Sequence, residues 1–168
     1  MGFRTINPTA NTTPDPGQGG LSVTGATNTG HASTTALAIG ATSTTRSCIW
    51  SGFPSAVGQI SAVNLKVDFI QDGTLSDGGI ATSNGFRIQY SLNGGGAWIS
   101  LRDVTQITSL SNGTDTVALS VNQDLTQVQV RGRLVANSIA GQSASLTATV
   151  SGIRLEVSTL DAGANAIW

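Results

Sequence analysis

Few residues in this 168-residue chain have side chains suited to catalysis. His31 is the single histidine and Cys48 the single cysteine, whereas nucleophilic catalysis usually needs a general base beside the nucleophile. His31 stands in Thr-Gly-His-Ala-Ser, which indicates an exposed turn, and Cys48 stands in Ser-Cys-Ile-Trp, which is typical of a small buried residue. A glycosidase needs two placed carboxylates, and nothing pairs Asp68, Asp103 and Glu156. We therefore expect a protein that is not an enzyme.

Three aspartates form the best metal-site candidate. Asp68, Asp72 and Asp77 could converge around Ca²⁺, which takes oxygens from carboxylates and loop carbonyls. Their spacing matches no EF-hand, and Asp-Gly pairs are ordinary turn residues, so the turn interpretation is favoured. The sequence also contains no phosphate-binding loop, dinucleotide fingerprint or zinc-ligand cluster. We expect no cofactor and no metal.

Arginine and glutamine on predicted strands point to binding. Their long planar donors suit sugar hydroxyls or the backbone carbonyls of a partner, and arginine is enriched at interfaces where lysine is depleted. The alternative is that they keep an open sheet face soluble in a chain whose only lysine is Lys66. The candidates are Arg87 and Gln89, then Gln127, Gln129, Arg131 and Arg133, and finally Arg154.

Two tryptophans are further candidates for contact with a ligand or partner. Trp98 follows a glycine-rich turn, and the hairpin register decides its place. A loop of two or four residues turns Trp98 outward as a stacking platform for a sugar ring, whereas a loop of three turns it into the core, which is the favoured placement. Trp168 ends a Gly/Ala-rich tail and is suited to fill a neighbour's pocket. Trp50 is predicted to lie in the core.

The elements that must position these residues are strands. In the clearest one, Phe86, Ile88 and Tyr90 alternate with polar residues, as in a strand with one buried and one exposed face. Asn93 and the three glycines after it supply the positive φ angles of a tight turn, and residues 97–101 form the second arm of the hairpin.

Similar alternation and turn signals divide the rest of the chain. A phase change beside Ser151-Gly152 predicts a β-bulge in the last strand. Eight to ten strands without a helix predict an all-β fold, an antiparallel two-sheet sandwich of the jelly-roll type. The expected strands are 21–23, 36–41, 46–53, 60–70, 117–121, 124–136 and 143–157, with 104–110 as strand or loop and Asn112-Gly113 as a turn.

Composition bounds the kinds of partner. Charged residues make up 10% of the chain and the formal net charge is −1, so we expect no electrostatic attraction to nucleic acid or acidic membranes. The uncharged run 16–45 is interrupted by Gly, Ser and Thr, which excludes membrane insertion. The first residues lack the apolar segment of a signal peptide.

Three regions are predicted along the chain. Residues 1–20 form an extended N-terminal arm because of their prolines and glycines; residues 21–158 form the β-sandwich domain; residues 159–168 form a C-terminal tail. An arm of this composition becomes ordered against another surface, and a neighbouring subunit is the surface we expect. We therefore expect a homo-oligomer that assembles through its arm, its tail and its sheet faces.

Two stretches resemble known families. Residues 86–98, FRIQYSLNGGGAW, resemble the YS-x-(D/N)-G-G…W hairpin of extracellular and phage-borne β-sandwiches. Residues 128–133 and 145–157 resemble the final strand pair of jelly-roll domains in structural proteins of tailed-phage virions and, less strongly, in carbohydrate-binding modules. The resemblance implies a non-enzymatic virion protein, of the capsid decoration or tail-associated type, that binds other virion proteins. The alternative is a carbohydrate-binding module or lectin-like sandwich, extracellular or at a cell surface, that binds a glycan.

Overall fold

A computed structural model describes residues 2–12, 21–22, 30–34, 44–75, 85–104, 110–136 and 144–160. These residues form strands and one turn of 3-10 helix, and none of them belongs to a helix that could cross a membrane. The elements are β1 (Gly2–Ile6), β2 (Ala10–Thr12), β3 (Leu21–Ser22), β4 (Gly30–Thr34), β5 (Thr44–Ser51), β6 (Gln59–Leu75), β7 (Gly85–Ser91), β8 (Ile99–Val104), β9 (Ser111–Leu119), η1 (Leu125–Gln127), β10 (Gln129–Ala136) and β11 (Ala144–Leu160).

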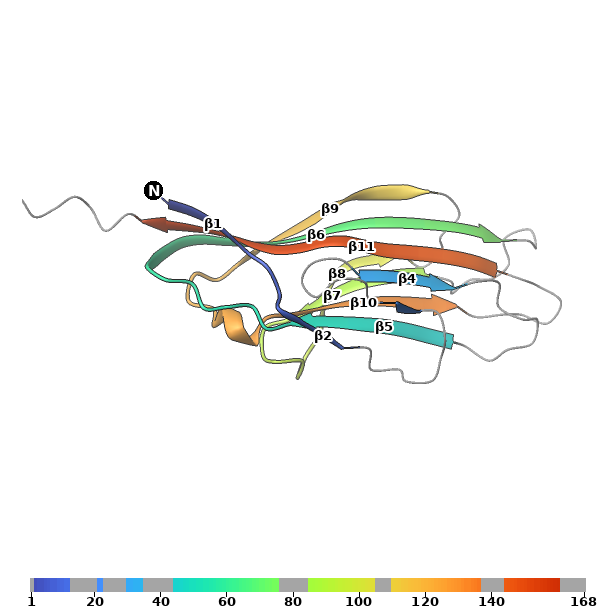
Figure 1. The fold of residues 1–168 in the computed structure, drawn as a ribbon, viewed down its shortest axis with the longest axis horizontal. Coiled ribbons are helices and arrows are strands. Elements are labelled where there is room, and N and C mark those ends of the chain that lie inside the picture. The colour runs from blue at the N-terminus through green and yellow to red at the C-terminus, as the bar shows by residue number, and fades with distance from the viewer. Residues whose placement is uncertain are drawn as a thin grey trace, which may run out of the picture.

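The strands form two antiparallel sheets that lie one over the other (Figure 1). In sheet A the order is β3-β4-β11-β6-β9, and β1 also pairs with β11; in sheet B the order is β2-β5-β10-β7-β8. The chain passes repeatedly from one sheet to the other, so that β4-β11-β6-β9 faces β5-β10-β7-β8. This is the strand order of a jelly roll. The predicted all-β, two-sheet antiparallel sandwich is confirmed.

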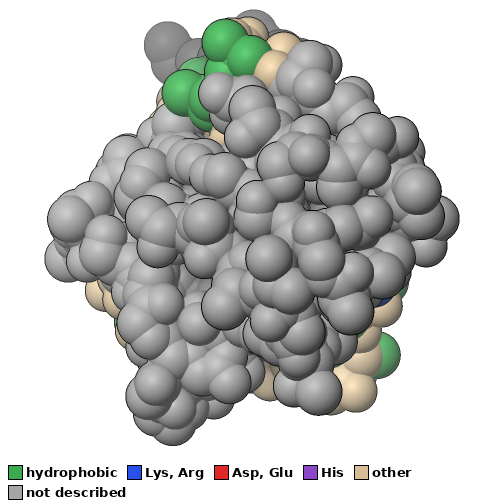
Figure 2. Space-filling view, turned by 90° about the vertical axis from the view of Figure 1, so that its right-hand side faces the viewer, with side chains coloured by type: hydrophobic (Ala, Val, Ile, Leu, Met, Phe, Trp, Pro, Cys, Tyr) green, Lys and Arg blue, Asp and Glu red, His purple; other side chains and the backbone are tan. Residues whose placement is uncertain are grey.

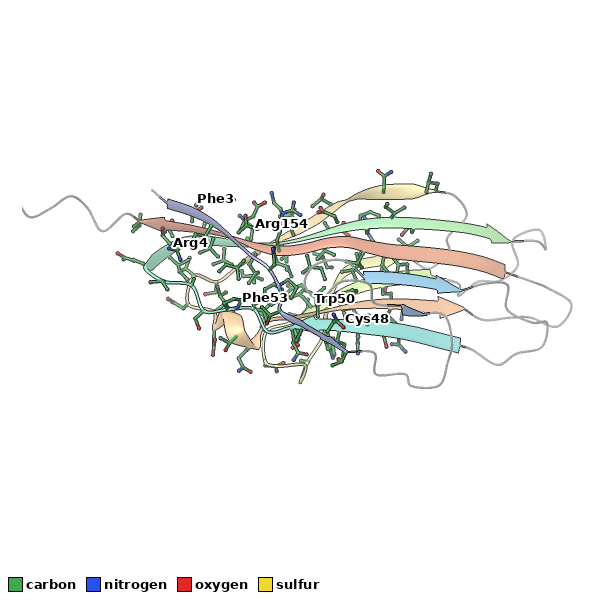
Figure 3. All side chains as sticks on the ribbon, viewed as in Figure 1. Phe3, Arg4, Cys48, Trp50, Phe53 and Arg154 are labelled. Atoms are coloured by element: carbon green, nitrogen blue, oxygen red, sulfur yellow. The ribbon has the colours of Figure 1, made fainter. Side chains whose placement is uncertain are left out.

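The core lies between the sheets and is built by alternation. Val63, Leu65 and Val67 on β6 are at most 1% exposed, as the predicted strand 60–70 requires. Trp50 and Cys48 on β5 face the same core (Figure 3), and both are buried. Desolvation by burial raises the pKa of the Cys48 thiol to about 12, so this side chain packs as an apolar group, as predicted.

The predicted β-bulge in the last strand is confirmed. The register of β11 against β6 shifts between Val150 and Gly152. A Cβ atom on Gly152 would lie 2.8 Å from Asp68 Oδ2, so a larger residue there would force that carboxylate to move. The bulge turns the strand so that Ile153 and Leu155 continue the buried face.

Three local predictions are wrong. Asn112-Gly113 lies within β9 and is not a turn: Gly113 is opposite Phe69, whose ring lies 3.4 Å from the position of a Cβ on that glycine. The strand predicted from residue 124 starts later, because Asp124 caps η1 by accepting a hydrogen bond from Thr126 N at 3.0 Å. His31 lies in β4, opposite Thr149 of β11.

The N-terminal strands lie against the chain's own sandwich. β1 pairs with the end of β11, and β2 pairs with β5. Thr9, between the two strands, also binds the end of β5: its N–H donates to Ser51 O at 3.1 Å, and its hydroxyl donates to Gly52 O at 2.7 Å. The described part of the predicted arm thus has a surface within its own subunit, and a neighbouring subunit is not required to order it.

Several predicted features fall outside the described residues. They are the strand at 36–41, residues 105–109, the second half of the arm and the tail from residue 161, with Trp168. Figure 2 views the sandwich from the right-hand end of Figure 1, where the described side chains lie at the rim and hydrophobic ones gather at its upper edge. The predicted arginine and glutamine candidates on the described strands lie on the two sheets.

Candidate functional site

Five of the predicted binding residues lie together on the outer face of sheet B. On β10, Gln129, Arg131 and Arg133 alternate with core residues. Arg131 is directly opposite Gln89 of β7, and Arg133 is directly opposite Arg87. Residues opposite each other in antiparallel strands share one face of the sheet, so the register brings these long polar side chains side by side.

Trp98 joins this group through Arg131. The guanidinium carbon of Arg131 lies 4.2 Å from the centroid of the Trp98 ring, a cation–π contact of the kind that contributes about 0.5–1 kcal/mol at exposed sites. Arg131 Nε and Nη2 also donate to Gln89 Oε1 at 3.1 and 2.7 Å. Trp98 is half-buried and is not part of the core cluster, so its favoured placement in the core is wrong.

The hairpin register explains the position of Trp98. Tyr90 pairs with Ile99, so the connection runs over residues 91–98. This loop is longer than any of the two-, three- or four-residue loops considered from the sequence. Trp98 consequently stands at the end of the loop, beside β10, and not at an alternating strand position.

Polar contacts within the loop hold its shape. The Ser91 hydroxyl, which is fully buried, accepts a hydrogen bond from Gly95 N at 2.9 Å, and Asn93 Oδ1 accepts one from Ala97 N at 2.9 Å. Gly94 and Gly95 have φ angles of 68° and 93°, which favour glycine. No described non-glycine residue has a positive φ, so the positive φ expected for Asn93 is wrong.

The loop is also tied to the segment before β10. Gly94 N donates to Gln127 O at 2.9 Å, and Gln123 Nε2 donates to Leu92 O at 2.9 Å. A Cβ on Gly95 would lie 2.9 Å from Gln129 Oε1 and 3.6 Å from the Trp98 ring. The backbone of the loop therefore packs directly on two of the candidate binding residues and limits where they can move.

The arginines of this face differ in whether they have an ion-pair partner. Arg87 Nε lies 2.8 Å from Asp103 Oδ1, and both side chains are more than a third exposed, so this pair contributes at most about 1 kcal/mol to stability. Arg133 is half-buried and lies opposite Arg87. No hydrogen bond or ion pair joins Arg133 to the described part of the chain.

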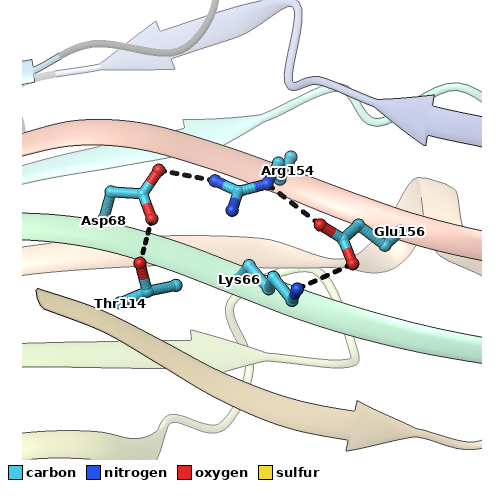
Figure 4. A network of polar contacts seen from close by, with 5 residues as sticks. All are labelled: Lys66, Asp68, Thr114, Arg154 and Glu156. Carbon is cyan, nitrogen blue, oxygen red and sulfur yellow. Dashed lines mark hydrogen bonds and ion pairs between the residues drawn. The ribbon is translucent and has the colours of Figure 1, made fainter.

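Arg154, another of the predicted arginine candidates, lies on sheet A. It is opposite Lys66 of β6 and alternates with the buried Ile153 and Leu155 (Figure 4). Its Nη1 lies 2.5 Å from Asp68 Oδ2, and its Nε lies 3.3 Å from Glu156 Oε1. Lys66 Nζ lies 2.8 Å from Glu156 Oε2, and the Thr114 hydroxyl donates to Asp68 Oδ1 at 2.6 Å. Two cations and two anions thus balance each other on sheet A.

This network favours the charged forms of Glu156 and Arg154. The hydrogen bond from Lys66 lowers the pKa of Glu156, and the hydrogen bond from Arg154 adds to the effect. Desolvation alone would lower the pKa of Arg154, but its hydrogen bonds to Asp68 and Glu156 outweigh it and raise the pKa. A surface whose charges are satisfied internally is a poor candidate for a ligand site.

The same network bears on the calcium candidate. Asp68 is held by Arg154 and Thr114, while the side chain of Asp72 and the whole of Asp77 lie outside the described residues. Within the described ranges, no group of three His, Cys, Asp or Glu side chains could hold a metal ion.

One polar contact between the sheets was not predicted. Arg102 on β8 makes two hydrogen bonds to Asp115 on β9, at 2.6 and 2.8 Å, and its guanidinium lies 3.6 Å from the centroid of the Phe69 ring. Asp115 stands two residues before Val117, and side chains two apart in a strand lie on the same face. The alternation of hydrophobic residues from Val117 onward therefore indicates that Asp115 points inward. Arg102 turns inward only because of the register shift between β7 and β8.

Comparison with known proteins adds little. No family model matches the chain, and no curated protein matches it. A solved structure of a carbohydrate-binding module, described as "CBM4 structure and function", aligns with 92% of this chain and 94% of that chain, at 9% sequence identity and a TM-score of 0.40. At that score the similarity carries no argument about function.

Proposed function

We propose that this protein is a non-catalytic binding module that binds a glycan on the outer face of sheet B. The observation that carries the proposal is the unit formed by Trp98, Arg131 and Gln89. It combines an aromatic ring with planar hydrogen-bond donors and an amide on adjacent strands. Sugars present apolar C–H faces and rings of hydroxyl groups, which such side chains suit.

The rigidity of the site supports the same proposal. Binding is weakened when side chains and loops must become ordered. Here Arg131 is held by Gln89 and by the indole ring, and the loop that carries Trp98 is tied to the segment before β10. Little further ordering is needed for a saccharide to bind.

Replacing Trp98 with alanine should weaken glycan binding by roughly tenfold or more, since stacking and burial of an aromatic side chain contribute a kilocalorie or more per mole. A glycan array would identify ligands, and isothermal titration would measure the affinity of each variant. Phe3→Ala is the matched control, because Phe3 is an aromatic residue of sheet A that is 64% exposed. Equal affinities of the Trp98→Ala variant and the unaltered protein would contradict the proposal.

A structural role in a virus particle is the second candidate. Three large apolar side chains are exposed at one end of the sandwich: Phe3 at 64%, Val57 at 72% and Leu160 at 46%. The start of β1 pairs with the end of β11, and Gly58 lies beside Thr159 of β11. Exposed apolar groups of this kind mark surfaces of association, and this end would serve a homo-oligomer or a contact with other virion proteins.

For this second candidate, Phe3→Ser should lower the mass of any assembly toward that of the monomer, as measured by light scattering after size exclusion. The point variant is sharper than deletion of residues 1–20, which would also remove β1 and β2 from their sheets. Leu110→Ser is the control, because Leu110 is equally exposed at 64% and precedes β9. A monomer in the unaltered protein at every concentration would argue against assembly.

A further inference from the structure

The two outer faces of the sandwich differ in how their charges are balanced. On sheet A, the network of Figure 4 contains equal numbers of cations and anions. Among the described strand residues, the outer face of sheet B carries more cations than anions, although the whole chain has a formal net charge of −1. The charged strand residues described on that face are Arg87, Arg131, Arg133 and Asp103.

Arg133 is the residue whose charge is least balanced. It lies directly opposite Arg87, and side chains in such pairs start only about 5 Å apart at Cβ, where like charges destabilise a sheet. Asp103 lies on the far side of Arg87 and forms an ion pair with it, while no described residue forms a hydrogen bond or ion pair with the side chain of Arg133. An anion bound between these strands would relieve the repulsion.

We propose that the glycan bound on the outer face of sheet B is acidic and that Arg133 binds a carboxylate of it; this rests on the proposed glycan-binding function. The guanidinium group matches a carboxylate with two parallel hydrogen bonds. Arg131, which stacks on Trp98, is two residues from Arg133 on β10, a separation of roughly 7 Å. One oligosaccharide can therefore contact the ring and the arginine together.

The distribution of charges favours an acidic saccharide over a nucleic acid. The chain has eight Lys and Arg residues in total, and Arg154 and Lys66 are already paired on the other sheet. Nucleic acids are held by many simultaneous phosphate contacts, which this face does not offer. A saccharide with carboxylates and apolar ring faces suits one unbalanced arginine beside one tryptophan.

The test compares alginate oligosaccharides, which carry a carboxylate on each sugar, with neutral glucan oligosaccharides of equal length. Titration calorimetry should show alginate bound about tenfold more tightly, with affinity falling at high salt. Arg133→Gln should weaken alginate binding by roughly tenfold and leave neutral glucans unaffected, since hydrogen bonds between charged groups are the stronger kind. Arg4→Gln, which removes an exposed arginine of β1, should change neither affinity.

The other possible results would refute the acidic ligand, the carboxylate preference or the glycan-binding function itself. Neutral glucans bound as tightly as alginate, with loss in Trp98→Ala, would refute the acidic ligand and leave the glycan-binding function standing. Dextran sulfate bound as tightly as alginate would refute the carboxylate preference. If no saccharide binds, the proposed function fails as well. Arg133→Lys, which keeps the charge and loses the planar fork, should bind alginate more weakly and serves if the glutamine variant does not fold.

Discussion

Replacing Phe53 with alanine should lower the free energy of unfolding by about 3–5 kcal/mol, the range for removing a buried phenylalanine. Phe53 is 1% exposed and lies just beyond the end of β5, near Trp50 and Cys48 of that strand (Figure 3). Gly52 before it has a φ of 74°, and a Cβ there would lie 2.5 Å from the Thr9 hydroxyl. The backbone just before the ring is therefore packed closely against Thr9.

Urea or guanidinium denaturation would measure this change. Phe3→Ala is the control: Phe3 is 64% exposed, and its removal should change the free energy of unfolding by no more than about 0.5 kcal/mol. The slope of the transition should stay the same in both variants, because the surface exposed on unfolding is nearly unchanged. A loss below about 1 kcal/mol for Phe53→Ala would mean that this ring does not pack between the sheets as described.

The alternating strands could be predicted from the sequence because alternation is a local property. Phe86, Ile88 and Tyr90 face the core, and Arg87 and Gln89 face outward, as expected. A strand buried on one side must alternate with period two, and no other segment is needed to see it. The bulge beside Gly152 was visible for the same reason, since it interrupts that period.

Turns and registers could not be predicted with equal success, because they depend on distant segments. Asn112-Gly113 reads as a turn on its own, but Gly113 serves β9 by leaving space for the Phe69 ring of β6. The loop before Trp98 is long because it is bound by Gln123 and Gln127, some thirty residues later in the chain. No local pattern carries that information.

The partition of the binding candidates between two faces is also a consequence of strand order. Arg131 and Arg154 both alternate with buried residues, and nothing in the sequence separates them. The jelly-roll order puts β10 beside β7, so Arg131 meets Gln89; it puts β11 beside β6, so Arg154 meets Asp68. Only this pairing shows that one arginine belongs to a balanced network and the other to the candidate site.

Removing Asp115 should have the second large effect on stability, with Asp115→Ala lowering the free energy of unfolding by about 2–3 kcal/mol. Arg102 and Asp115 are only 24% and 16% exposed. Breaking a buried ion pair leaves an uncompensated charge, at a loss of about 3–5 kcal/mol when burial is complete. The residual exposure of both groups reduces that figure here. Arg102 would remain over the Phe69 ring with its carboxylate partner gone.

A double-mutant cycle separates the pair energy from the loss of single side chains. Arg102→Leu combined with Asp115→Ala should recover part of the loss, because an apolar pair leaves no buried charge. The matched cycle on Arg87 and Asp103, an ion pair of the same types with 39% and 46% exposure, should give a coupling of at most about 1 kcal/mol. β8 and β9 are edge strands of opposite sheets, so the Arg102–Asp115 pair links the two sheets at one edge of the sandwich. An equally small coupling for this pair would mean that it does not stabilise that edge. The packing around Phe69 would then hold the two sheets together there.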